Sequence, residues 1–303
     1  MRIGYPCINR TIGCTPSRTF RLGSYSKERL IETVGANLTC LSAILEYNVR
    51  RGILFFRITS DLVPFASHEI SQFPWQEQFS AQFKTTGKFI RDHALRISMH
   101  PDQFVLLNSK KEEVLRRSIA DLQYQVSVLD LLGLDESAKV QIHVGGVYDD
   151  KSASIDRFVS QYLALDPRIR RRLVIENDER LYTVADCCAI SDKTGVPVLF
   201  DAFHHSLHNN REALPVLLDQ VRATWHEADG IPMVDYSSQL AGKRPGAHAE
   251  TIDIPDFQRF LAMTGTRDID VMLEIKDKEI SAQKALLVAG ADPRLVTGMP
   301  DSR

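Results

Sequence analysis

The chain contains a series of short apolar runs, and most of them end in an acidic residue or a histidine. Each run is rich in Val, Ile, Leu or Phe, which is typical of a strand buried on both faces. A buried parallel strand has no use for a charge at its carboxyl end unless something there binds it. In a (β/α)8 barrel the carboxyl ends of all strands converge on one face, where active sites form. The residues at these ends are Asp61, His100, His143, Glu176, Asp201, His204, Asp235 and Glu274.

Strand-like runs alternate with amphipathic helical segments along the chain, which predicts an α/β protein with a single (β/α)8 TIM barrel. We expect one catalytic domain over residues 1–303, with Ala291–Arg303 as a flexible tail. The expected strands are Arg2–Tyr5, Leu54–Thr59, Leu95–Met99, Val140–Val144, Leu173–Ile175, Val196–Phe200, Ile231–Val234 and Ile269–Leu273. The expected helices are Ser26–Tyr47, Trp75–His93, Val114–Leu132, Ser154–Leu163, Val184–Lys193, Asn209–Thr224, Pro255–Met263 and Ser281–Ala289, with Ser26 as an N-cap.

Length and composition set limits on the class of protein. A chain of 303 residues is normal for one barrel of this kind, which needs roughly 250 residues or more. No apolar run approaches the roughly 20 residues that a membrane-spanning helix needs, so we expect a cytoplasmic protein without membrane contact. The formal net charge of −2 means that nucleic-acid binding would need a local basic patch. The five cysteines, an odd number with an adjacent pair, predict reduced thiols.

The acids and histidines at the strand ends form a candidate metal site. Any one of them alone could be a hydrogen-bonded polar residue, but several unpaired carboxylates in one small space would repel each other strongly. A glutamate shared between two cations suits a cluster of two or three divalent ions, about 3.5–4 Å apart. The expected ligands are His100, His143, Glu176, Asp201, His204, Asp235, His248 and Glu274, and we expect Glu176, Asp201 and Glu274 to carry the catalysis.

Basic residues near the same face fit contacts with DNA phosphates. The loop Asn9–Gly23 carries Arg10, Arg18 and Arg21 among small residues, and Lys243 with Arg244 forms a second basic point; the alternative is an ordinary solvated loop. The run Arg168–Arg172 precedes a strand, so we expect a solvated turn on the opposite face. Phe104 either stacks on a base or belongs to the core.

Several motifs, taken together, resemble those of the UV damage endonuclease family, over nearly the whole chain from residue 2 to about 290. They are RIGY, RITSDLVP, SMHPDQF, IHVGG, VIEND, FDAFHH, DYSSQ with GAHAETI behind it, and VMLEIKDKE. The resemblance implies a barrel similar to that of the apurinic endonucleases. It also implies that His100, His143, Glu176, Asp201, His204, His248 and Glu274 bind divalent metal, often manganese.

The resemblance also assigns residues to lesion recognition. Tyr5 and Gln103 match the pair that probes the duplex where the damaged dinucleotide is flipped out, and Asn9 matches a nearby polar residue. We add His68, the best of the remaining histidines, to this group. The family commonly has a lysine and a histidine where this chain has Met233 and Asp235. Asp235 can replace the histidine as a ligand, but Met233 cannot replace the lysine. We therefore expect two well-bound ions, with a third position between His204 and His248 that is weaker or empty.

The function implied is a metal-dependent DNA repair endonuclease that nicks the phosphodiester immediately 5′ of a UV photoproduct or a related lesion. The expected cofactor is Mn²⁺, with Mg²⁺ or Zn²⁺ as alternatives, and the expected partner is damaged double-stranded DNA. We expect a monomer without a nucleotide cofactor. The alternatives are an apurinic-site endonuclease, a divalent-metal sugar isomerase on the same barrel, and a non-enzymatic metal-storing or DNA-binding module.

Overall fold

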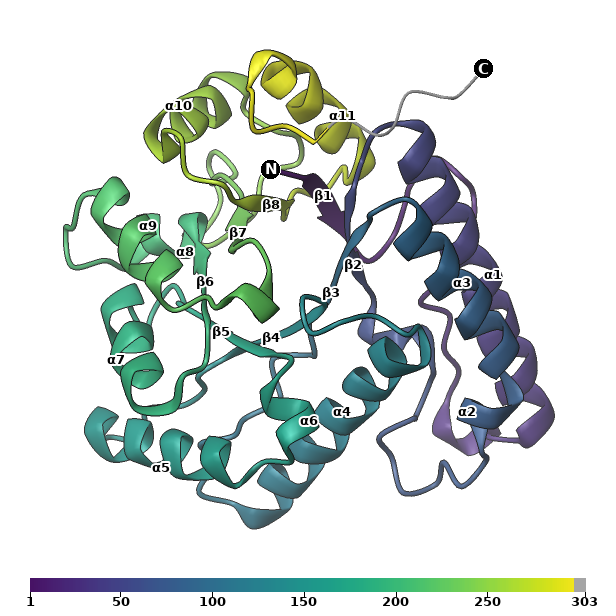
Figure 1. Cartoon of the computed structure of the whole chain (residues 1–303). Coiled ribbons are helices and arrows are strands. Elements are labelled where there is room, and N and C mark those ends of the chain that lie inside the picture. Colours follow the sequence, from purple (N-terminus) through teal and green to yellow (C-terminus); the bar gives the residue numbers. More distant parts are fainter. Residues whose placement is uncertain (297–303) are drawn as a thin grey trace.

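In the computed structural model, which describes residues 1–296, eight parallel strands close into a barrel in chain order (Figure 1). Every strand is almost entirely buried, as the apolar runs predict for strands covered on both faces. The expected TIM-barrel fold is therefore confirmed. The strands are β1 (Ile3–Pro6), β2 (Phe55–Ile58), β3 (Arg96–Met99), β4 (Lys139–His143), β5 (Leu173–Glu176), β6 (Val198–Asp201), β7 (Met233–Tyr236) and β8 (Asp270–Leu273).

The helices surround the strands as an outer ring (Figure 1). Among the described residues, no helix is both long enough and apolar enough to cross a membrane. The α-helices are α1 (Lys27–Arg50), α2 (Trp75–Gln78), α3 (Ser80–Asp92), α4 (Glu112–Leu131), α5 (Lys151–Ala164), α6 (Pro167–Arg170), α7 (Val184–Thr194), α8 (Ala202–Leu207), α9 (Leu214–Ala223), α10 (Ile254–Thr264) and α11 (Glu279–Val288). Short 3-10 turns are η1 (Leu22–Ser24), η2 (Ser60–Leu62), η3 (Glu227–Asp229) and η4 (Ala289–Ala291).

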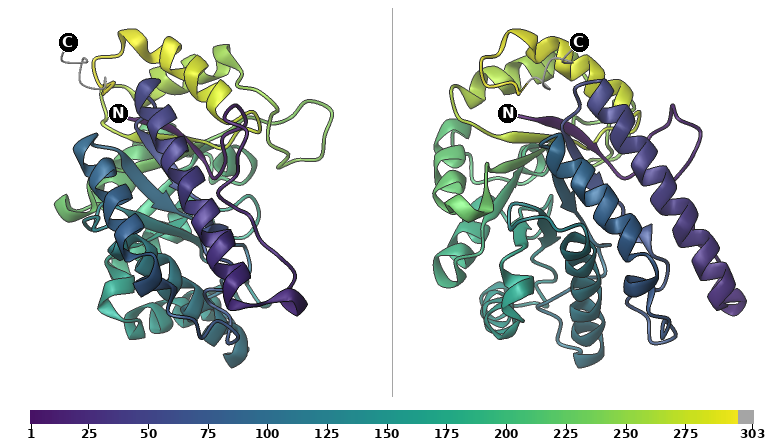
Figure 2. Two further views of the ribbon diagram at one scale, coloured as in Figure 1. Left: turned by 90° about the vertical axis from the view of Figure 1, so that its right-hand side faces the viewer. Right: turned by 45° about the vertical axis from the view of Figure 1, so that its right-hand side comes forward.

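The register of the strands brings the polar ends together on one face. His143 of β4 pairs with Glu176 of β5, and Asp201 of β6 pairs with Asp235 of β7. The first two strands approach so closely that a Cβ on Gly4 would lie 1.9 Å from the carbonyl oxygen of Phe55. Glycine is therefore required at this position of β1. The loops after β1 and β7 lie on the same side of the barrel (Figure 2).

Two expected helices differ from the observed ones. The segment Trp75–His93 divides at Phe79 into α2 and α3. In the segment Asn209–Thr224, the helix (α9) begins only at Leu214. An unexpected helix, α8, directly follows β6. Asp201 caps α8, since its side chain accepts a hydrogen bond from the His204 amide. The expected N-cap of α1 is confirmed, because the Ser26 side chain accepts from the Arg29 amide at 3.2 Å.

The structure differs in part from two expectations about exposed segments. In the run Arg168–Arg172, Arg168 and Arg171 are exposed as expected. Arg172, which we expected in a solvated turn, is only 6% exposed. Its guanidinium pairs with Asp130 at 2.8 Å and donates to three backbone carbonyls, so it joins segments of the barrel wall. The first part of the expected flexible tail, residues 291–296, is packed on the barrel, where Arg294 donates to Thr264 Oγ1 and the Val296 amide to the Met1 carbonyl. Residues 297–303 of that tail lie outside the described part.

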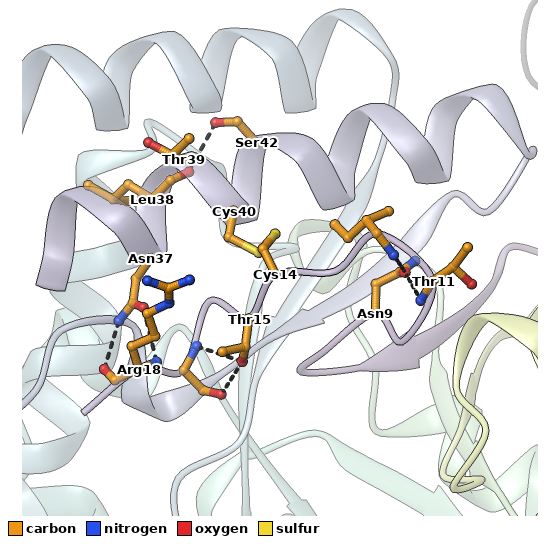
Figure 3. The surroundings of a disulfide bond; sticks show 12 residues. Asn9, Thr11, Cys14, Thr15, Arg18, Asn37, Leu38, Thr39, Cys40 and Ser42 are labelled. Carbon is orange, nitrogen blue, oxygen red and sulfur yellow. Dashed lines mark hydrogen bonds between the residues drawn. A yellow bond between two sulfur atoms is a disulfide. The ribbon is translucent and has the colours of Figure 1, made fainter. Parts of the chain in front are cut away.

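The expectation of five reduced thiols is also wrong, because Cys14 and Cys40 form a disulfide (Figure 3). The bond joins the arginine-containing loop after β1 to α1. Asn37 of the same helix accepts from the Arg18 amide and donates to the Arg18 carbonyl, each at 3.0 Å. Spacing alone could not reveal this pair, since only the fold brings the two sulfur atoms together.

Removal of this disulfide should lower stability. A cross-link between residues separated by 26 positions restricts the unfolded chain by about 3 kcal/mol. We expect the Cys14→Ser/Cys40→Ser protein to unfold at a lower denaturant concentration, with a free energy of unfolding lower by about that amount. Dithiothreitol should produce the same shift in the wild-type protein. Cys188→Ser is the matched control, because Cys188 is a free cysteine. Equal stability with and without reductant would contradict the prediction.

Candidate metal centre

The first group of possible ligands lies at the ends of β3, β4 and β5. His143 Nε2 is 3.2 Å from Glu176 Oε1, and His100 Nε2 is 3.7 Å from Glu176 Oε2. One ligand atom from each of the three residues lies within 4.8 Å of the other two. The two imidazoles and one carboxylate suit a divalent transition-metal ion.

The second group shares Glu176 with the first. Glu176, Asp201 and His204 also place one ligand atom each within 4.8 Å of one another. His204 Nδ1 is 3.5 Å from Asp201 Oδ2 and 3.7 Å from Glu176 Oε1. Asn177 fixes the backbone here, since it donates to the Asp201 carbonyl and accepts from the Asp201 amide. The structure thus places Glu176 between two donor groups, as expected of a shared ligand.

The third group consists of carboxylates alone: Asp201, Asp235 and Glu274. Asp235 is fully buried, and its Oδ1 atom has no hydrogen-bond partner among the described residues. His248 lies beside this group, with Nε2 4.0 Å from Glu274 Oε2 and Nδ1 2.7 Å from the Glu274 carbonyl. All the expected ligand residues therefore gather at the carboxyl ends of the strands.

Two buried residues that we did not expect connect these carboxylates. The Arg57 guanidinium donates to Asp235 Oδ2 at 2.6 Å and to Glu274, and the Gln141 amide donates to Asp235 and Glu176. A signal for Arg57 was present in the sequence, because a charged residue stands in the middle of the apolar run FFRI. A buried arginine at that position is favourable only if an anion is buried beside it.

Burial shifts the pKa values of the acids in the cluster. Burial raises the pKa of Glu176 to about 8, that of Asp201 to about 6 and that of Asp235 to about 7. Burial would also raise the pKa of Glu274, but the charges of Arg57, His100 and His248 together outweigh it and hold that pKa below its usual range. Burial would lower the pKa of His204, but the charges of Asp201 and Glu176 raise it to about 9. The donor set therefore fits divalent cations, which would let all these carboxylates ionise together.

A cleft of about 840 Å³ opens over the cluster. Its floor includes His100, His143, His248 and Glu274, and Gln103 and Phe104 stand exposed beside them. Phe104 is 74% exposed, so it does not belong to the core. The cleft also contains basic residues, of which we expected only the first: Arg244, Lys276 and Lys278.

Tyr5 and Asn9 do not reach this cleft, contrary to the expected role in probing DNA. Tyr5 is fully buried, and its hydroxyl donates to Asn48 Oδ1 at 2.7 Å and accepts from Asn9 Nδ2 at 2.9 Å. Asn9 is 4% exposed, and its Oδ1 accepts from the amides of Thr11 and Ile12. Their contacts hold the start of the loop after β1 against α1.

The other residues expected to contact DNA are exposed, but they lie outside the lining of the cleft. Glu279 accepts from the Arg10 amide at 3.0 Å, and Asn37 holds the Arg18 backbone (Figure 3). These contacts fix the loop and leave the arginine side chains exposed. The remaining members of this set are Arg21, Lys243 and His68.

The chain matches the family described as UV-endonuclease UvdE over residues 1–289. It belongs to this family. A UV DNA damage endonuclease of Clostridium perfringens (strain 13 / Type A) is 38% identical over 288 residues, which make up 94% of this chain and 70% of that protein. The UV DNA damage endonuclease of Bacillus cereus (strain Q1) is 34% identical over 291 residues, 93% of this chain and 92% of that protein. The crystal structure of SacUVDE shares 45% identity with a TM-score of 0.92, and the match covers 96% of this chain and 98% of that one.

More distant structures share the fold alone. Endonuclease IV from Thermus thermophilus has a TM-score of 0.58 at 18% identity, covering 96% of this chain and 98% of that one. The D-psicose 3-epimerase from Clostridium cellulolyticum has a TM-score of 0.55 at 13% identity, covering 82% and 92%. The family resemblance is therefore confirmed, whereas these neighbours confirm only the barrel.

The burial of Tyr5 predicts a structural effect of its mutation. Tyr5→Phe removes the hydroxyl that joins Asn48 and Asn9, and leaves their buried polar atoms without a partner. We expect the free energy of unfolding to fall by about 1–3 kcal/mol, with unchanged metal content. Tyr148→Phe is a suitable control, since the Tyr148 hydroxyl makes no hydrogen bond to the described residues. Unchanged stability with loss of preference for damaged DNA would instead support the probing role.

Proposed function

We propose that this protein is a metal-dependent endonuclease that repairs UV-damaged DNA by cutting the phosphodiester immediately 5′ of the lesion. Family membership supports the activity on UV-damaged DNA, since the named relatives are UV DNA damage endonucleases. The observation that supports the metal dependence is the position of Glu176 between two donor groups that share it.

In this proposal His100, His143 and Glu176 would hold the first ion, and Glu176, Asp201 and His204 would hold the second. Divalent ions bound here would supply an activated water as nucleophile and would neutralise the charge that develops on the departing 3′ oxygen. Imidazole and carboxylate donors together suit Mn²⁺, with Mg²⁺ and Zn²⁺ as the alternatives. The protein residues then serve to hold the ions and orient the phosphate, so no side chain needs to act as the nucleophile.

The cleft suits a strand of damaged double-stranded DNA. Arg244, Lys276 and Lys278 offer positive charges for phosphates along its walls. Gln103 and Phe104 are exposed at the same opening, where a polar and an aromatic side chain can occupy the space left by flipped bases. A damaged step costs less to unstack than an intact one, so this mode of entry selects lesions. We propose that a single copy of the chain is sufficient.

The test is a nicking assay on a duplex with one site-specific photoproduct, in the presence and absence of Mn²⁺. We expect a single nick 5′ of the lesion that requires the metal. Glu176→Gln keeps the side-chain volume but removes the shared charge, so nicking should fall by about 100-fold or more. Equal nicking without metal, or full activity and full metal content in Glu176→Gln, would refute the proposal. A duplex with an abasic site in the same nicking assay tests the apurinic-endonuclease alternative. Conversion of a ketose, measured separately with the same metal, tests the sugar-isomerase alternative.

The exposed pair at the cleft predicts a separate effect on specificity. Gln103→Ala and Phe104→Ala should reduce the preference for damaged over intact duplex, by about 1–3 kcal/mol for the aromatic residue. The metal content should not change, because neither residue belongs to a donor group. Competition binding with damaged and intact duplexes measures the preference, and Phe73→Ala, outside the cleft lining, is the control. A loss of bound metal in either cleft variant would contradict this separation of roles.

A further inference from the structure

Arg57 lies among the carboxylates of the third donor group. Its side chain is 3% exposed and extends from β2 into the carboxyl end of the barrel. Nη2 donates to Asp235 Oδ2 at 2.6 Å and to Gln141 Oε1 at 2.7 Å, and Nη1 donates to Glu274 Oε1. The guanidinium thus engages one oxygen from each of two neighbouring acids.

The three donor groups differ in their relation to this guanidinium. The group at His100, His143 and Glu176 and the group at Glu176, Asp201 and His204 contain neither carboxylate that pairs with Arg57.

The third group contains both of those carboxylates, Asp235 and Glu274. A divalent ion held by the same two acids would lie a few ångströms from the fixed positive charge of Arg57, which disfavours it. The guanidinium is a permanent cation with donors in a planar fork, so it matches two carboxylates as an ion would.

The neighbouring residue on β7 provides no replacement ligand. Met233 lies two positions before Asp235, so both side chains fall on the same face of the strand. Met233 is fully buried, and a thioether is a poor ligand for the harder divalent cations.

We infer that the Arg57 guanidinium takes the place of a third divalent cation between Asp235 and Glu274, so that the centre is complete with two ions. The inference rests on the proposed metal-dependent function. It assigns to Arg57 the role of holding Asp235 and Glu274 in position and balancing part of their charge.

The experiment counts the ions bound per chain. The purified protein and its variants are dialysed against excess Mn²⁺, and bound manganese is measured by elemental analysis and by calorimetric titration. We expect two ions in the wild-type protein and three in Arg57→Met, in which the third group is freed. Arg57→Lys keeps a positive charge and should still bind two. Arg96→Met is the matched control, since Arg96 is a buried arginine that pairs with Asp270, away from the cluster, and it should also bind two.

Three ions in the wild-type protein, or two in folded Arg57→Met, would overturn the inference. If Arg57→Met does not fold, Arg57→Gln provides the same loss of charge with a polar side chain, and the same counts apply. The wild-type count also separates this inference from the proposed function. No bound divalent ion would refute the metal-dependent function, whereas three bound ions with normal nicking would refute only the role of Arg57.

Discussion

The whole site depends on four carboxylates that are brought into one small space with little access to water. Glu176, Asp201 and Asp235 are at most 2% exposed, and Glu274 is 20% exposed. Buried carboxylates repel each other and lose hydration, so this arrangement is stable only when positive charge is supplied. Arg57 supplies part of this positive charge. Bound ions would supply the remaining positive charge, and the histidines of the cluster offer nitrogen ligands for them. Burial accordingly raises the pKa values of three of these acids, Glu176, Asp201 and Asp235.

The barrel creates this constraint through strand register. Because all strands run parallel, each places its last side chains on the same face, and neighbouring strands bring them side by side. The pairing of His143 with Glu176 and of Asp201 with Asp235 follows directly from the ladder. A helix that starts immediately after β6 then turns His204 back toward Asp201, which caps that helix. Strand pairing and one helix cap thus bring together residues that are far apart in the sequence.

Features that depend on a single segment could be predicted from the sequence, whereas contacts between distant segments could not. The barrel and the acids and histidines at the strand ends were predictable, because each depends on the pattern of a single run and on one face shared by all strands. The Cys14–Cys40 disulfide, the burial of Tyr5 and the ion pairs of Arg57 were not predicted, since each depends on a partner from a distant segment. Arg57 left a trace as a charge inside an apolar run, but its partners could be named only from the fold.

The two ends of the barrel differ in how their buried acids are matched by positive charge. At the amino-terminal end, Lys139 pairs with Asp229. Asp270 forms salt bridges with both Arg2 and Arg96. There the buried acids are matched by cations of the chain itself, which favours a closed and stable structure. At the carboxyl end, the Arg57 guanidinium pairs with only two of the four acids, Asp235 and Glu274, and that end opens into the cleft. The excess of negative charge at this end is a cost to folding that bound cations would offset. In the proposed function, the same ions would therefore link stability to activity.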